Sequence, residues 1–243
     1  ALEARNHGDH ELIAEKLEPA RKIIWDSTRE DPSFADAYCL LGYTDMLQNN
    51  IELAFVNLNK AVQKDEDNTL AHYYRGQLYF ALYTIGLDEL ASDEAEQKLS
   101  SKLAREYETR LKTVERFKAN ALADFTGIRK NRLGSARNAY CTGIVAYLEN
   151  KPDAAIKELQ KAVRTNPYYP EALLVLGVLY ERNGQVDMAI ECFTRVLEDN
   201  KSDILAYYNR ANLYTGKGMF EEAIADYKKI EYFNAAGYPV IFL

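Results

Sequence analysis

The sequence predicts an all-α solenoid of about six helix–turn–helix units with one long helical insertion. The clearest unit is residues 171–200, which read as two amphipathic helices joined by a turn at Asn183-Gly184. Apolar residues recur in each helix at helical spacing, so that each helix has one apolar face. These residues are Leu173, Leu176, Gly177 and Tyr180 in the first helix and Ala189, Phe193 and Val196 in the second. Because one such hairpin cannot bury its apolar face alone, it needs neighbours of the same kind.

A regular repeat period supplies these neighbours along most of the chain. The positions equivalent to Gly177 are Gly8, Gly42, Gly76, Gly143 and Ala211. The positions equivalent to Ala189 are Ala20, Ala54, Ala155 and Ala223. Neighbours lie one period apart, except for one gap of nearly two periods in the first series and one of nearly three in the second. A chance helical bundle would not keep this register, so the chain is a repeat array with an insertion at about residues 86–135.

This pattern resembles the tetratricopeptide repeat, whose 34-residue signature has an aromatic residue, Leu-Gly, Tyr, Ala, Phe and Pro at fixed offsets. In the clearest unit these offsets hold Leu173, Leu176, Gly177, Tyr180, Ala189, Phe193 and Lys201. Leu173 therefore replaces the aromatic residue, and Lys201 replaces the closing Pro. The resemblance implies a right-handed superhelix that acts as a non-catalytic scaffold for protein–protein interaction. Its partner would be another protein or peptide, and no cofactor is expected.

Composition disfavours several other classes of protein. The 243 residues are 47% hydrophobic and 28% charged, which is too apolar for a disordered chain. The net charge of −7 disfavours nucleic-acid binding, which usually requires a basic face. No apolar run reaches the roughly 18 residues that would indicate a membrane span.

The cellular compartment stays open. The three cysteines, Cys39, Cys141 and Cys192, fall in different units and form no CxxC motif, so we interpret them as buried structural thiols. Their odd number gives no disulfide framework, which favours a reducing, cytoplasmic compartment. The chain begins at Ala1 without a Met, so a processed periplasmic or membrane-anchored form is the alternative.

The units are expected to form a single domain over residues 1–243. Their predicted ranges are 1–34, 35–68, 69–135, 136–169, 170–203 and 204–237, with an apolar tail at 238–243. Pro19 is expected at the start of the second helix of the first unit, where its missing N–H costs little. Asn49-Asn50 predicts a turn, because Asn tolerates a left-handed backbone. Asn68 is expected to cap the helix that follows it.

The insertion is predicted to contain one long helix over residues 92–125, since this stretch has neither Pro nor Gly. Ser92 is its expected N-cap. A degenerate extra repeat is the alternative. Part of the helix would extend past its neighbours with an apolar stripe of Leu111, Val114, Phe117 and Leu122. Soluble chains rarely leave such a stripe in water, so we expect it to be an interaction arm.

The resemblance also implies a concave groove, formed by the second, fifth, ninth and twelfth positions of each first helix. These positions hold Asp36, Cys39, Tyr43, Met46, Leu70, Tyr73, Gln77, Phe80, Arg137, Tyr140, Ile144, Tyr147, Glu171, Leu174, Val178, Glu181, Leu205, Tyr208, Asn212 and Thr215. From them we predict a partner-binding groove of Tyr43, Tyr73, Gln77, Phe80, Tyr140, Ile144, Tyr147, Val178, Tyr208 and Asn212. Tyrosines suit a binding surface because each offers a ring and a hydroxyl. Packing against neighbouring helices is the alternative for these rings.

Other sequence features do not indicate a catalytic or metal-binding site. His10-Glu11 begins an HExxH motif, but Ala14 replaces the second histidine, so no metal site is expected. We find no catalytic constellation, and the Lys/Asn/Arg set with which some tetratricopeptide proteins clamp a peptide carboxylate does not match. The basic residues Arg129, Lys130 and Arg132 predict either a dock for an acidic partner or a solvated turn.

The leading functional prediction is a scaffold that binds an extended peptide or a helix of a partner in the aromatic groove. One alternative is a structural subunit of a larger or self-associated assembly, joined through the long inserted helix or the apolar tail. Another is a binder of an apolar small molecule, such as a transporter accessory protein. An enzyme is disfavoured.

Overall fold

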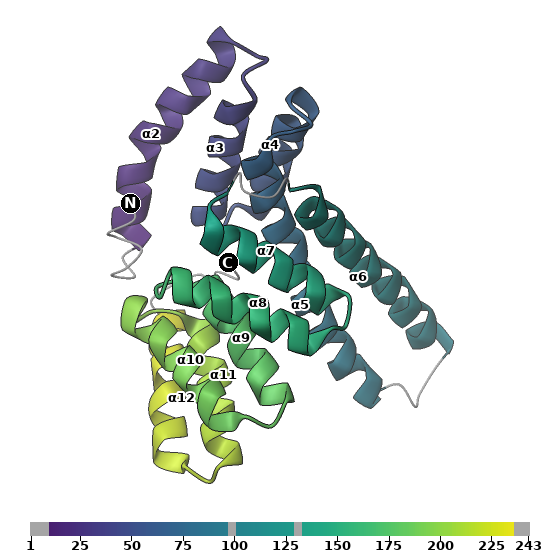
Figure 1. The fold of residues 1–243 in the computed structure, drawn as a ribbon, viewed down its shortest axis with the longest axis vertical. Coiled ribbons are helices and arrows are strands. Elements are labelled where there is room, and N and C mark those ends of the chain that lie inside the picture. Colours follow the sequence, from purple (N-terminus) through teal and green to yellow (C-terminus); the bar gives the residue numbers. More distant parts are fainter. Residues whose placement is uncertain (1–9, 97–100, 129–132, 236–243) are drawn as a thin grey trace.

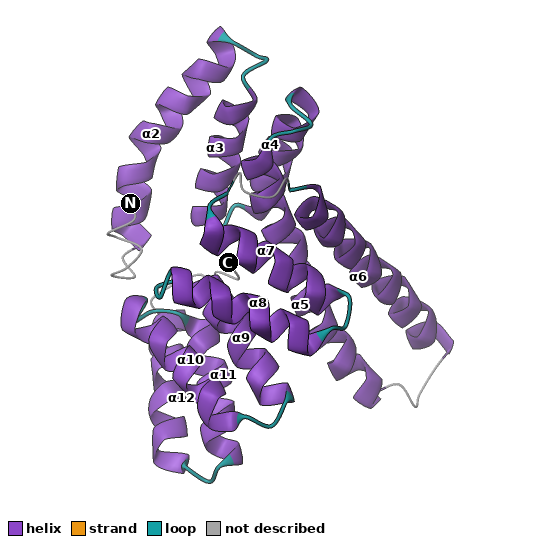
Figure 2. Cartoon of the chain, viewed as in Figure 1, coloured by secondary structure: helices purple, strands orange, loops and turns teal. Residues whose placement is uncertain are grey.

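The computed structural model describes residues 10–96, 101–128 and 133–235, which form helices joined by short connections, without a strand (Figure 1). The helices are α2 (His10–Glu30), α3 (Ala35–Leu47), α4 (Ile51–Lys64), α5 (Thr69–Glu96), α6 (Ser101–Gly127), α7 (Ser135–Leu148), α8 (Pro152–Thr165), α9 (Pro170–Arg182), α10 (Val186–Asp199), α11 (Ile204–Gly216) and α12 (Phe220–Ala235). Figure 2 shows short loops between α7 and α8, between α9 and α10, and between α11 and α12. The predicted all-α solenoid of helix–turn–helix units is confirmed.

The helices pack as an array in which each contacts the next one in sequence, from α2 to α12. In addition, α3 contacts α5, and α9 contacts α11. The first helices of the pairs are α3, α5, α7, α9 and α11. We call them the inner helices and their partners (α4, α6, α8, α10 and α12) the outer helices.

The turns inside four of the pairs share one backbone feature. Asn49 and Asn150 have φ angles of 58° and 57°, and Gly184 and Gly218 have φ angles of 73°. Asn and Gly are the residues that adopt this left-handed conformation at low cost, and they commonly end helices in this way. The predicted turns at Asn49-Asn50 and Asn183-Gly184 are confirmed.

Small residues allow the two helices of a pair to approach closely. A Cβ atom added to Gly177 would lie 2.7 Å from the ring of Phe193, and one added to Gly143 would lie 2.8 Å from Leu159. Phe193 and Ala189 are fully buried on the outer helix α10. The position of Gly177 therefore has room for a hydrogen and for no larger group.

Three buried aspartates tie neighbouring helices together. The pairs are Asp45 with Arg21, Asp124 with Arg75, and Asp226 with Arg210. Arg75 also donates to Asn59 Oδ1 at 2.9 Å, so it joins three helices. His72 lies 2.7 Å from Asp124, and this hydrogen bond raises the pKa of His72 above its usual value. Each buried carboxylate is thus paired with an arginine, and this pairing offsets the free-energy cost of burying its charge.

The expectation for Pro19 is wrong. Pro19 lies inside α2, which runs without interruption from His10 to Glu30. Proline in a helix interior removes a hydrogen bond and usually kinks or breaks the helix. The residues before it are strong helix formers such as Leu, Ala, Glu and Lys. Leu17 is buried where α2 packs on α3, so tertiary contacts support a helix that continues through the proline.

The single long helix predicted for residues 92–125 is also wrong. Residues 92–96 end α5, whereas residues 101–125 belong to α6, which packs along α5. A Cβ atom added to Gly86 would lie 2.5 Å from Val114, and one added to Gly76 would lie 3.2 Å from Phe125. The two helices are therefore antiparallel. Ser92 lies within α5 and does not begin a helix.

The insertion thus lengthens both helices of one pair, giving an extended hairpin of α5 and α6. Val114 is 4% exposed, and Phe117 and Leu122 pack partly buried against the same core. The ring of Phe117 lies 6.4 Å from that of Tyr79. Leu111 is 38% exposed. Most of the predicted stripe is therefore packed within the chain, against the core that includes α5.

Candidate binding groove

Two adjoining cavities lie along the inner helices. The first, which we call the inner-helix cavity, has a volume of about 440 Å³ and is lined by α5, α7, α9 and α11. Its apolar lining includes Phe80, Tyr147, Leu174, Val178 and Leu205. Its polar lining includes Gln77, Asp88, Glu171, Glu181, Arg182 and Asn209. All of these side chains come from inner helices, because successive first helices present the same face to one side.

The second cavity, which we call the loop cavity, has a volume of about 500 Å³. It is lined by α3, α5, the first turns of α7 and α9, the ends of α8 and α10, and the connections that precede α7, α9 and α11. Lining residues include Tyr43, Tyr74, Arg137, Tyr168, Asp199 and Asp203. Gln77 and Glu171 line both cavities, so the two adjoin. We call the combined surface the groove.

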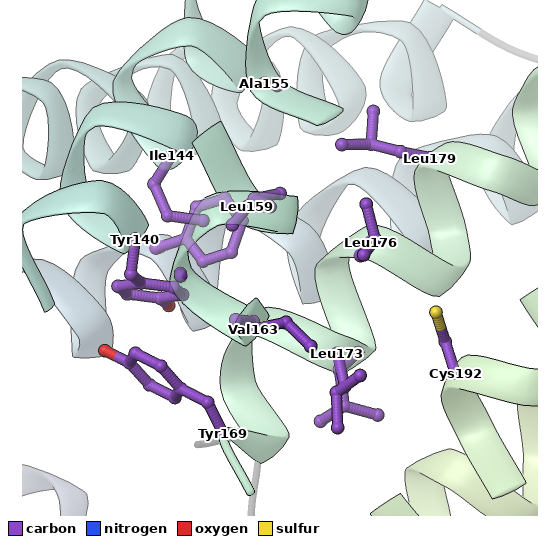
Figure 3. Close-up of a cluster of buried hydrophobic side chains, with 14 of the residues drawn as sticks. Tyr140, Ile144, Ala155, Leu159, Val163, Tyr169, Leu173, Leu176, Leu179 and Cys192 are labelled. Atoms are coloured by element: carbon purple, nitrogen blue, oxygen red, sulfur yellow. The ribbon is translucent and has the colours of Figure 1, made fainter. Parts of the chain in front are cut away.

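A cluster of buried tyrosines supports the groove between the two cavities. The hydroxyl oxygens of Tyr73 and Tyr169 are 2.7 Å apart, and Gln77 Nε2 donates to Tyr73 at 3.1 Å. The ring of Tyr140 lies 5.1 Å from that of Tyr169, and Figure 3 shows these two rings next to each other beside Ile144 and Leu159. Burial raises the pKa of Tyr73, Tyr140 and Tyr169 well above the usual value. These hydroxyls therefore stay protonated and serve as hydrogen-bond partners.

Aromatic contacts hold the two arginines of the groove. The guanidinium of Arg137 lies 5.6 Å from the centre of the Tyr73 ring, and that of Arg182 lies 5.6 Å from the centre of the Tyr147 ring. Both distances allow a cation–π interaction. Tyr43 and Tyr74, which also line the loop cavity, stack with their ring centres 4.6 Å apart. Each arginine that lines the groove is therefore in contact with a tyrosine ring.

Seven of the ten predicted groove residues line these cavities. They are Tyr43, Tyr73, Gln77, Phe80, Tyr140, Tyr147 and Val178. Ile144 is fully buried, whereas Tyr208 and Asn212 are exposed and line neither cavity. Asn212 Oδ1 instead accepts a hydrogen bond from the Tyr227 hydroxyl at 2.7 Å. Tyr73 and Tyr140 are 3% and 2% exposed, so they support the groove more than they present surface.

Sequence reasoning missed two kinds of lining residue. Thr84 and Asp88 lie beyond the normal end of a first helix, in the part of α5 that the insertion adds. Tyr168 lies in the connection before α9 and Asp199 is the last residue of α10, and the inner-helix rule covers neither position. The signal that could have located the first kind is Ala121, which precedes the Ala-like position of the next unit by one repeat period. It places the second helix of the third unit at residues near 121, and therefore places a longer first helix before it.

The remaining predictions concern the basic cluster, the C-terminal tail and the cysteines. Arg129, Lys130 and Arg132, like the tail at 238–243, lie outside the described residues, so the predicted dock stays a prediction. The three cysteines are buried, and burial raises the pKa of Cys39, Cys141 and Cys192 to about 12.

Across the described part of the chain, no group of three or more His, Cys, Asp or Glu side chains could hold a metal ion. None of the described helices has the length and apolar character needed to cross a membrane.

Comparison with protein families gives two matches, both described as tetratricopeptide repeat. They cover residues 146–213 and 204–236. These regions contain α8–α12 and part of α7, which are the most regular pairs of the array. Proteins of this family are generally non-catalytic scaffolds for protein–protein interaction, and neither match indicates an enzyme.

Curated relatives agree with these matches. The chain is 21% identical to tetratricopeptide repeat protein 37 of Xenopus laevis over 88% of its own length and 16% of that protein. It is 25% identical to anaphase-promoting complex subunit 7 of Dictyostelium discoideum over 85% of its own length and 36% of that subunit. The chain therefore spans well under half the length of either relative.

A solved structure agrees in fold. A tetratricopeptide protein of Thermus thermophilus superimposes with a TM-score of 0.54 at 18% identity, covering 86% of this chain and 95% of that one. The repeat period, the inner and outer helices, the small residues between them and these matches all agree. The chain belongs to the tetratricopeptide repeat family.

Proposed function

We propose that the groove binds an extended peptide or a helix of a partner protein, and that the chain is a scaffold for this interaction. The observation that carries the proposal is the pair of adjoining cavities along the inner helices of consecutive units. A long ligand could contact both cavities at once, since they meet at Gln77 and Glu171. Repeat solenoids use the extended surface that their inner helices form for such contacts.

The lining of the inner-helix cavity suits a protein side chain. Phe80, Leu174 and Val178 offer apolar contacts, and polar groups surround them. Binding sites commonly combine an apolar interior with a few polar groups that fix orientation. A volume of about 440 Å³ lies within the range of such sites. An apolar side chain of the partner would therefore be the anchor, and its polar neighbours would set its direction.

The tyrosine cluster makes the surface rigid before binding. Tyr73, Tyr169 and Gln77 are joined by hydrogen bonds beneath the groove, and Tyr140 packs against Tyr169. Side chains that are already ordered lose little entropy when a ligand arrives. The buried tyrosines thus contribute to affinity indirectly, whereas partly exposed rings such as that of Tyr147 offer direct contact.

The proposal is tested by selecting peptides from a random display library on the immobilised chain. Peptides that bind are then measured by fluorescence anisotropy against two variants. Val178→Trp fills the inner-helix cavity, whereas the matched control Met188→Trp changes an exposed residue on the outer helix of the same unit. We expect Val178→Trp to weaken binding at least about tenfold, in line with the loss of an anchor contact. Met188→Trp should bind like the parent.

Both variants should give the parent's circular dichroism spectrum and melting temperature. A library that yields no peptide sensitive to Val178→Trp would contradict the proposal. Equal losses in both variants would show that the effect comes from the fold and not from the groove.

An assembly subunit is the second candidate, because a separate apolar face favours it. Phe220 and Ile224 on α12 are 62% and 52% exposed, and Tyr227 follows them at helical spacing. Among the relatives, anaphase-promoting complex subunit 7 is by name part of a complex. Light scattering over a range of protein concentrations would detect self-association of this chain, and Phe220→Asp should then reduce it.

A further inference from the structure

The charge of the groove indicates the chemistry of the peptide, on the basis of the proposed function. Five carboxylates line the two cavities: Asp88, Glu171, Glu181, Asp199 and Asp203. The cationic side chains lining them are Arg137 and Arg182. Each of these arginines lies over a tyrosine ring, at 5.6 Å from the ring centre. The groove therefore carries more negative than positive charge.

Carboxylates line both cavities, whereas apolar side chains are distributed unevenly along the groove. Phe80, Leu174, Val178 and Leu205 make the inner-helix cavity the more apolar of the two. The loop cavity has fewer large apolar side chains, chiefly Met46 and Leu133, and its lining includes Asp199, Asp203 and Tyr168, which is 71% exposed. The stacked rings of Tyr43 and Tyr74 border the same cavity. Rings and carboxylates together are the surroundings that a lysine or arginine side chain favours.

We propose that the groove selects a basic peptide segment, with an apolar side chain in the inner-helix cavity and a lysine or arginine in the loop cavity. The methylene groups of the basic side chain would pack on Tyr168 and the Tyr43–Tyr74 pair, and its charged end would approach Asp199. A groove with a net negative lining attracts basic segments and repels acidic ones, so charge supplies selectivity while the apolar anchor supplies much of the affinity. The occupant is a segment of another protein chain.

The electrostatic pattern also disfavours one type of partner. A peptide that ends in acidic residues and a free carboxylate would bring negative charge to Glu171 and Glu181. Like charges placed together cost free energy and suppress binding of the wrong partner. Acidic segments should therefore be rejected even when they carry a suitable apolar residue.

The test uses the same random peptide library and compares the peptides retained by the parent with those retained by Val178→Trp. Peptides that depend on Val178 should be enriched in lysine and arginine next to an apolar residue. For one such peptide, changing its basic residue to Glu should weaken binding about tenfold or more. Raising the salt concentration should weaken the parent complex, because partly exposed charges are screened.

Matched charge variants then locate the effect. Glu181→Gln with Asp199→Asn removes two charges from the groove, whereas Glu191→Gln with Glu198→Gln removes two exposed charges from the outer helix α10. We expect the first pair to weaken the basic peptide about tenfold and the second pair to have less than about a twofold effect. The charge inference would be overturned if the selected peptides were neutral or acidic, or if both double variants bound the basic peptide equally well. Either result would leave the proposal of a peptide-binding groove standing. Absence of any peptide dependent on Val178 would instead overturn the proposed function, and this inference with it.

Discussion

The pair α9–α10 and the extended hairpin α5–α6 are the same unit built at two lengths. The helices of the first pair have 13 and 14 residues, and those of the second have 28 and 27. The stretch from Gly76 to Phe125 exceeds the stretch from Gly177 to Phe193 by nearly one whole repeat. Yet each glycine faces its aromatic partner in the structure. The base of the unit has therefore kept its packing while both helices grew at the turn.

The added length has its own contact points. Gly86 admits Val114 at a distance that no side chain at residue 86 could tolerate, and Tyr83 and Leu90 are buried nearby on α5. The longer hairpin thus repeats, farther from the base, the arrangement of a small residue on one helix against a larger one on the other. The comparison teaches that a unit of this array can be extended where its helices turn, provided that the extension supplies its own small-to-large contacts.

The largest expected effect tests whether the packing of Gly177 on Phe193 and that of Gly76 on Phe125 stabilise the chain equally. Phe193→Ala and Phe125→Ala should each lower the free energy of unfolding by about 3–5 kcal/mol, because each ring is buried and would leave a cavity. Denaturation by urea followed by circular dichroism measures the change. Phe220→Ala, at an exposed phenylalanine, is the control and should stay within about 0.5 kcal/mol of the parent. A small loss for Phe125→Ala alone would mean that the extended hairpin is not fastened at its base as the regular pair is.

A smaller effect is expected at the glycines that let the helices approach. Gly177→Leu should destabilise the chain by roughly 1–3 kcal/mol, because its side chain would overlap the ring of Phe193. Gly86→Leu should overlap Val114, and its effect should concentrate in the added part of the hairpin. Thermal melting measures the first effect, and hydrogen exchange along α5 and α6 locates the second.

Gly216→Leu is the control for both changes, since nothing lies within 4 Å of a Cβ atom at that position. Because leucine favours helix more than glycine does, this variant should be neutral or slightly more stable. Uniform loss of protection throughout the chain in Gly86→Leu would show that the hairpin unfolds only together with the rest of the array.

The smallest effect is expected on the outer surface of the hairpin. Leu111→Asp should change the free energy of unfolding by no more than about 0.5 kcal/mol, because Leu111 is partly exposed. Phe117→Asp should cost more, since the Phe117 ring packs near Tyr79. Light scattering reports the oligomeric state of both variants. If Leu111→Asp dissociates an oligomer that the parent forms, the hairpin is an intermolecular arm, and the comparison with an ordinary unit no longer accounts for it.

The fold was accessible from the sequence wherever the repeat period was unbroken. The period placed the turns at Asn49 and Gly184, because these turns depend on contacts within one unit. It failed at residues 92–125, where a lack of Pro and Gly was taken for continuity of one helix. A chain can reverse between two helices without either residue when the flanking helices gain enough from packing together. The recurrence of Ala121 and Phe125 at the offsets of Ala189 and Phe193 was the stronger signal.

The candidate groove was only partly accessible for a similar reason. The position rule found Phe80, Tyr147 and Val178, because the inner face of a helix follows from its period alone. Whether a side chain there is exposed depends on its neighbours: Ile144 satisfies the same rule and is fully buried. Tyr168 lines the groove from a connection, and no helical period predicts the direction of a connection.

The length of α5 has a consequence for what the groove can admit. A regular inner helix begun at Thr69 would end near residue 81, yet Thr84 and Asp88 also line the inner-helix cavity. The inserted residues therefore extend the lining of the cavity, and they belong to the same helix, α5, as Gln77. At 1.5 Å per residue this helix is about 42 Å long. A molecule bound to the far end of α5 would therefore contact the same helix that lines the cavity at Gln77, Thr84 and Asp88.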